Sequence, residues 1–201
     1  GGCMAGEYII GVPSHATRVL RIKPGFGPIA DELDLLGDEE HHGNYKWGGA
    51  ATDGNGVVWT IPSNGDCLLR IVPETGDISV HGKELLDNYK NKWQGAVIGC
   101  DGNVYCVPCD AMSVLVINTE TAQLSLVGRL DAKKKKFQGG ARAPDGSIYC
   151  LPESSERILR IVPNSEARKL GAHGRGRSRR GKREGPVGWL DRLLQDFRRC
   201  V

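Results

Sequence analysis

Two cysteines have a spacing that is used in redox chemistry and in zinc binding. They stand in the run Cys106-Val-Pro-Cys109. A redox pair usually has a helix N-terminus that lowers the pKa of one thiol, and a zinc site needs two further ligands. No second cysteine pair completes four ligands, and Cys106 recurs as Cys150 at the same place in a repeated segment. We therefore expect small buried hydrophobic residues here, with metal or redox chemistry as the alternative.

An acidic stretch followed by two histidines could hold a divalent metal ion. It reads Asp38-Glu39-Glu40-His41-His42. Adjacent histidines in an acidic loop are more commonly solvated, and no phosphate-binding loop, nucleophile elbow or zincin motif occurs in the sequence. We expect no catalytic residue, no metal and no cofactor.

Polar segments follow a recurring proline and form the candidate binding face. They begin at Ser14, Ser63, Asp110 and Glu153. Their residue types differ from one copy to the next, as divergent binding loops would, although unconstrained surface loops diverge too. The candidate ligand-binding residues are His15, Asn64, Asp66, Asp110 and Glu153.

The C-terminal part differs in kind from the rest. Residues 168–201 hold 11 Lys and Arg against 3 Asp and Glu, so the rest of this +3 chain carries −5. A Gly/Arg-rich run over 171–188 is predicted to be a disordered linker, and 189–201 has the apolar spacing of a short amphipathic helix. Nucleic acid or an anionic surface is the expected partner of six basic residues: Arg175, Arg177, Arg179, Arg180, Lys182 and Arg183. A spurious reading of non-coding sequence after about residue 172 is the competing interpretation.

Three segments of the sequence align with one another without gaps over sixteen residues. They are 47–62, 93–108 and 137–152, each preceded by lysine, with periods of 46 and then 44 residues. A truncated fourth copy opens the chain at Tyr8. The repeats span about 6–45, 46–91, 92–135 and 136–170. Such a period is typical of repeat architectures.

Each repeat reads as four short strands. A small-residue strand follows the aromatic residue, and the pair Asn55-Gly56, Asp101-Gly102 or Asp145-Gly146 then predicts a type I′ hairpin turn. The second strand ends at the proline, the third is a Val-Leu-x-Ile-like run, and a polar turn leads to the fourth. We expect the aromatic residues of both inner strands to pack between neighbouring units. Glycines at positions 49, 95 and 139 suit an innermost strand.

Four antiparallel strands per 40–50 residues predict the blade of a β-propeller. The pattern Lys-Trp-x-Gly-Ala…Asp-Gly-x-Val-Tyr-x-Val-Pro…Val-Leu-x-Ile resembles the YVTN, NHL, gluconolactonase-like and virginiamycin-B-lyase-like propellers over roughly residues 6–170. The resemblance implies a lactonase or lyase activity with a metal site, but neither site maps onto this chain residue by residue. Asp101 and Asp145 are better explained as turn residues.

The sequence therefore predicts an all-β, partial and open β-propeller of about four four-stranded blades with a basic tail. The first copy has no Lys-Trp-x-Gly segment before Tyr8, so we expect it to lack its innermost strand. The leading functional hypothesis is a non-enzymatic scaffold whose loop face binds a protein or a small ligand. The alternatives are a fragment of a lactonase- or lyase-like enzyme with its metal site partly in missing blades, and tethering through the tail.

Composition bounds the remaining properties. Glycine supplies 28 of 201 residues, about twice the average share of roughly 7%, which disfavours helix bundles. Seven cysteines without a framework spacing favour reduced thiols and a cytoplasmic or nuclear location. No apolar run approaches the roughly 20 residues of a transmembrane helix. The chain begins with Gly1 rather than Met, and we expect an incomplete N-terminus.

Overall fold

Four antiparallel sheets make up the molecule. The computed structural model describes residues 1–25, 32–37, 40–86 and 89–163. Blade 1 contains β1 (Gly2–Ala5), β2 (Tyr8–Gly11), β3 (Val19–Lys23) and β4 (Glu32–Leu36). Blade 2 contains β5 (Trp47–Thr52), β6 (Val58–Pro62), β7 (Leu68–Val72) and β8 (Asp77–His81). Blade 3 contains β9 (Trp93–Ile98), β10 (Val104–Pro108), β11 (Val114–Ile117) and β12 (Leu124–Val127). Blade 4 contains β13 (Phe137–Arg142), β14 (Ile148–Pro152) and β15 (Leu159–Ile161).

The strands of each blade pair in chain order, which confirms the four-stranded repeat unit. The expectation that blade 1 lacks its innermost strand is wrong. Residues Gly2–Ala5 form β1, and Gly2 pairs with Gly11 while Ala5 pairs with Tyr8. Small residues and a tight turn, in which Gly6 has φ +58°, are enough to build this strand without the aromatic signature of the later blades. The fourth strand expected for blade 4 lies outside the described residues.

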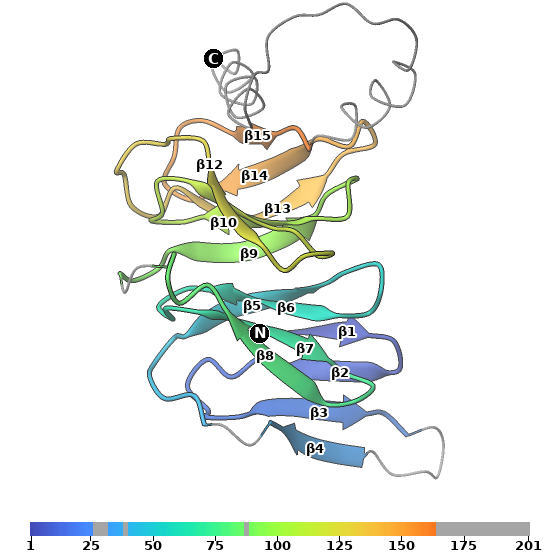
Figure 1. The fold of residues 1–201 in the computed structure, drawn as a ribbon. Helices are drawn as coiled ribbons and strands as arrows, with labels where there is room; N and C mark the ends of the chain where they lie inside the picture. The colour runs from blue at the N-terminus through green and yellow to red at the C-terminus, as the bar shows by residue number, and fades with distance from the viewer. Residues whose placement is uncertain (26–31, 38–39, 87–88, 164–201) are drawn as a thin grey trace, which may run out of the picture.

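The blades form an open arc, as predicted. Each innermost strand contacts the next along the series β1, β5, β9 and β13. These strands approach closely: a Cβ atom added at Gly95 would lie 3.2 Å from Gly139 Cα. Blade 1 and blade 4 lie at opposite ends of the stack (Figure 1). The ring is therefore not closed within the part of the chain that the structure describes.

Three hydrophobic clusters hold the blades together, one at each junction. Because side chains alternate along a strand, blades 2 and 3 each contribute to two clusters, whereas blades 1 and 4 each contribute to one. In β6, Val58 packs in the cluster shared with blade 1, whereas Trp59 and Ile61 pack in the cluster shared with blade 3. The inner-strand aromatic residues Trp47, Trp93 and Phe137 are buried at successive junctions, as the sequence predicts.

The hairpin turns between the first two strands differ from the prediction. In blade 2, Gly56 N donates to Asp53 O (3.1 Å) and Asp53 N donates to Val57 O (2.9 Å). Only the glycine has positive φ, +78° at Gly56, and Asn55 does not. This is a type I turn followed by a glycine bulge rather than a type I′ turn. A type I′ turn would need positive φ at both central residues of the turn, here Gly54 and Asn55, and neither has it. The loop instead contains one extra residue, Gly56, which takes the positive φ.

Candidate functional site: the loop face

A hydrogen-bonded belt runs across the loop face from blade to blade. It links the residue after each recurring proline to the buried lysine that opens the next blade. Lys46 N donates to Ser14 O (3.1 Å), Ser63 N to Lys46 O (2.9 Å) and Lys92 N to Ser63 O (3.0 Å). The chain of bonds continues through Cys109 and Lys136 to Glu153. The loops after the second strands are therefore fixed to the crossings between blades.

The lysines of this inter-blade belt are buried and satisfied by backbone carbonyl groups. Lys46 Nζ donates to the carbonyl oxygens of Ser14 (3.2 Å), Ala16 (2.9 Å) and Gly43 (3.0 Å). Lys136 Nζ donates to Asp110 O (3.2 Å) and Lys133 O (2.7 Å). Burial lowers the pKa of both ammonium groups. The sequence shows the recurring lysine, but its role as an inter-blade clamp is visible only in three dimensions.

The residue immediately before each of the three belt lysines adopts the left-handed backbone conformation. These residues are Tyr45, Asn91 and Lys135, with φ of 54°, 55° and 53°. Such a conformation is unusual for residues other than glycine. The belt holds it in place, since Asp110 N donates to Asn91 O (2.9 Å) and Asn64 N donates to Tyr45 O (3.0 Å). The three side chains share no type, so the sequence carries no signal of this strain.

Two candidate ligand-binding residues act as inter-blade contacts. Asn64 Oδ1 accepts from Asn91 N (2.9 Å), and Asp110 Oδ1 accepts from Lys135 N (2.7 Å). At the equivalent place in blade 1, the His15 ring lies edge-on against Tyr45, with centroids 4.3 Å apart. In each of these three junctions, the second residue after the recurring proline therefore contacts the residue with the left-handed backbone conformation.

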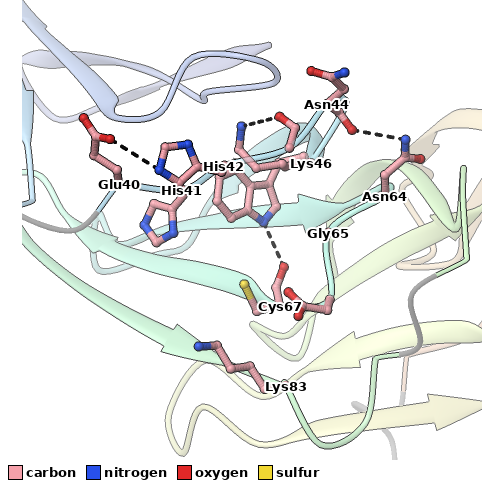
Figure 2. A pocket seen from close by; sticks show the side chains of 12 residues that line it. Glu40, His41, His42, Asn44, Lys46, Asn64, Gly65, Cys67 and Lys83 are labelled. Atoms are coloured by element: carbon pink, nitrogen blue, oxygen red, sulfur yellow. Dashed lines mark hydrogen bonds and ion pairs between the residues drawn. The ribbon is translucent and has the colours of Figure 1, made fainter.

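A hollow of about 390 Å³ opens at the junction of blades 1 and 2 (Figure 2). We call it the junction pocket; its charged and polar lining includes Glu40, His41, His42, Asn64, Asp66 and Lys83. Trp47 also lines it, and its indole Nε1 donates to Cys67 O (2.9 Å). The pocket brings Asn64 and Asp66 together, while His15, Asp110 and Glu153 lie outside it.

The histidines flanking this pocket differ in their surroundings. His42 is exposed, and its Nε2 lies 3.4 Å from a carboxylate oxygen of Glu40. His41 is half-buried and lies edge-on against Trp47, with centroids 5.2 Å apart. Lys83 arrives from the crossing between blades 2 and 3, and a lone lysine in a polar loop gives no sequence signal of a shared site.

The remaining candidate residues lie at other junctions. Asp110 lines a second hollow of about 620 Å³ together with Lys90, Lys134 and Lys135. Glu153 is exposed, and one of its carboxylate oxygens is 3.9 Å from Cys109 Sγ. The candidate residues therefore do not converge on one site.

The thiols sit in surroundings that disfavour the thiolate. Burial, followed by the charges of Asp110 and Glu153, raises the pKa of Cys109 to about 11. Burial also raises the pKa of Cys150 to about 12 and raises that of Cys106 further. The described cysteines are all free. Within the described ranges, no three His, Cys, Asp or Glu side chains are grouped so that they could hold a metal ion.

The turn aspartates bond within their own hairpins. Asp101 Oδ2 accepts from the hydroxyl of Tyr105 (2.7 Å), and Asp145 Oδ1 accepts from Ser147 N (2.9 Å). Asp53, missed by the sequence analysis, accepts from Trp59 Nε1 (2.8 Å). These carboxylates stabilise the turns, as expected for Asp101 and Asp145.

The basic segment 171–188, with its six candidate residues, and the predicted helix 189–201 lie outside the described residues. Among the residues that are described, no helix is long and apolar enough to cross a membrane.

Comparison with known proteins supports the fold. Virginiamycin B lyase from Staphylococcus aureus superposes with a TM-score of 0.60 at 15% identity, covering 80% of this chain and 51% of the lyase. A protein described as a candidate 6-phosphogluconolactonase from Bacteroides uniformis gives 0.58 at 16% identity, with 82% and 50% covered. An auxiliary nutrient binding protein from Bacteroides thetaiotaomicron gives 0.53 at 13% identity, with 83% and 38% covered.

These similarities establish a β-propeller scaffold, as the repeat pattern predicts, and at such identities they concern the fold alone. The chain spans about half the length of the lyase and lactonase-like structures that it matches. No protein-family model matches the sequence. No curated protein matches it either.

Proposed function

We propose that this propeller arc is a binding module and that the junction pocket holds a small polar ligand. The observation that carries the proposal is that the same backbone hydrogen bonds recur at every junction, whereas the polar side chains that line the junction pocket do not recur. The inter-blade belt recurs at three junctions, whereas the histidines of the junction pocket occur only beside Lys46. A rigid framework with variable loops is the usual arrangement of binding sites.

The lining of the pocket indicates the class of ligand. Lys83 and the histidines can donate hydrogen bonds or attract an anion, and the carboxylates of Asp66 and Glu40 can accept from hydroxyl groups. A volume of about 390 Å³ suits a small molecule. A sugar or sugar acid offers both hydroxyl donors and anionic or carbonyl acceptors, and we take it as the ligand class.

Calorimetric titration with gluconate and with glucose tests this proposal. We expect binding of at least one probe, weakened about tenfold by Lys83→Ala or Asp66→Asn, because each removes a hydrogen bond to a charged group. Lys134→Ala, which changes the second hollow, is the matched control and should leave the affinity unchanged. Equal affinities in all variants would place the ligand elsewhere, and no binding of either probe would contradict the proposed ligand class.

A fragment of a lactonase- or lyase-like enzyme is the alternative function. Such an enzyme would need several metal ligands close together, and the described residues contain no group of three His, Cys, Asp or Glu side chains that could hold the ion. Metal analysis of the purified protein distinguishes the two hypotheses. A stoichiometric divalent cation that is lost on His42→Ala would favour the enzyme.

A further inference from the structure

The outward face of blade 4 carries the apolar pattern of a blade junction without a neighbour in the described structure. We call the side of a blade that packs on the next blade its forward face. In blade 2 this face includes Ile61 and Leu68, both fully buried in the cluster shared with blade 3. The equivalent residues of blade 4, Leu151 and Ile158, are 56% and 61% exposed.

The outward face of blade 1 is the complementary half of such a junction. The rear face of a blade, which packs on the preceding blade, includes Val104, Leu115 and Ile117 in blade 3, all fully buried. Their equivalents in blade 1 are Ile9, Leu20 and Ile22, all only half-buried. Leu33 and Leu35 on β4 of the same blade are exposed. Among the residues that the structure describes, the forward face of blade 4 and the rear face of blade 1 therefore have no neighbouring blade.

The interior junctions show how two such faces fit. The sixth residue after the proline of one blade and the seventh residue after the proline of the next share a cluster every time. The three pairs are Val19 with Leu69, Leu68 with Leu115, and Val114 with Leu159. The pair that continues this series joins Ile158 to Leu20, the sixth residue after Pro152 and the seventh after Pro13.

We propose that a second copy of this chain packs head to tail on the first, with the forward face of blade 4 against the rear face of blade 1 of its partner. A heterologous contact of this kind closes into a ring when the rotation between copies allows it. Two copies supply eight blades, within the range of about four to eight known for propellers.

We expect the new junction to be weaker than the interior ones, because association of two separate chains costs translational and rotational freedom that packing within one chain does not. We expect a dissociation constant in the micromolar range.

Sedimentation velocity of the full 201-residue chain under reducing conditions tests this assembly. We expect a concentration-dependent species of twice 21.8 kDa. Ile158→Glu and Leu20→Lys should each weaken association at least about tenfold, because each buries an unpaired charge. The double variant should recover part of the affinity, since the two charges face each other across the junction. Met112→Glu is the control: it alters an exposed apolar residue in the β10–β11 loop, outside both faces, and should have no effect.

Three outcomes would overturn the proposal. A monomer at up to about 100 µM would show that no second copy covers these faces. A dimer that is weakened only by Ile158→Glu would indicate contact between two forward faces. A monomer whose unfolding midpoint falls with Ile158→Glu but not with Leu20→Lys would indicate that residues 164–201 of the same chain cover blade 4. Circular dichroism of each variant verifies that the blades remain folded.

Discussion

The neighbours of Cys109 set the chemical reactivity of its thiol. Cys109 stands three residues from Cys106, but Cys106 packs in the hydrophobic cluster between blades 2 and 3, whereas the backbone of Cys109 belongs to the inter-blade belt. Its sulfur lies 3.8 Å from a carboxylate oxygen of Asp110 and 3.9 Å from one of Glu153. Burial, followed by the two nearby negative charges, opposes ionisation and raises the pKa of the thiol, so this residue is a poor nucleophile at neutral pH.

The raised pKa of Cys109 predicts a loss of stability at alkaline pH. In the unfolded chain the thiol ionises at about its ordinary value of 9.0, whereas in the folded protein it stays protonated up to about 11. Ionisation therefore favours the unfolded state as the pH rises from 9 to 11. The free energy of unfolding should fall more steeply in the wild type than in Cys109→Ala, by at most about 1.4 kcal/mol per pH unit. Urea unfolding at pH 8 to 11 measures this difference. Parallel profiles would show that the thiol ionises as easily in the folded protein.

The hairpins between the first and second strands of blades 2 to 4 have the same turn conformation. The glycine after the turn has positive φ in each, at Gly56, Gly102 and Gly146. The sequence locates these turns because glycine adopts this conformation without steric cost. It does not reveal that the preceding residue keeps negative φ, since both turn types accept Asn-Gly and Asp-Gly.

Gly102→Ala should therefore destabilise blade 3 through the backbone alone. At this position φ is +83° and an added Cβ would meet no atom within 4 Å, so the change introduces strain without a clash. We expect a loss of about 1 kcal/mol in the free energy of unfolding, measured by urea denaturation. Gly54→Ala is the matched control, because Gly54 is equally open and does not have positive φ. Equal stabilities of the two variants would show that the turn can relax around alanine.

In the molecule as a whole, the hydrophobic clusters and the inter-blade belt together join the four blades into one body. Each blade alone is a small twisted sheet whose two apolar faces need neighbours. The hydrophobic clusters supply most of that contact, and the buried lysines join the loop after one blade's second strand to the crossing that enters the next. Within the described ranges, the outer faces of blades 1 and 4 expose the same kinds of apolar side chain that the interior junctions bury.

Lys46→Met tests the contribution of the belt. The variant keeps the apolar stem but leaves the carbonyl groups of Ala16 and Gly43 without the ammonium donor. We expect the free energy of unfolding to fall by about 1–3 kcal/mol. Lys83→Met, at an exposed lysine of the same pocket, should change it by less than about 0.5 kcal/mol. If thermal and urea unfolding of Lys46→Met match the wild type, the desolvation of the ammonium group offsets its hydrogen bonds.

The repeat, the strands of blades 2 to 4 and the open arc could be predicted from the amino-acid sequence, because strand alternation, glycine turns and recurring prolines act over a few residues. The sequence did not reveal strand β1, because residues Gly2–Ala5 lack the repeat pattern. They form a strand through antiparallel pairing with β2. Nor could the sequence separate ligand-binding from structural roles for Asn64 and Asp110. Those roles depend on contacts with Asn91 and Lys135, which are 27 and 25 residues away along the chain. Only the packing of one blade on the next brings such groups together, so the position of the junction pocket could not be predicted from the sequence.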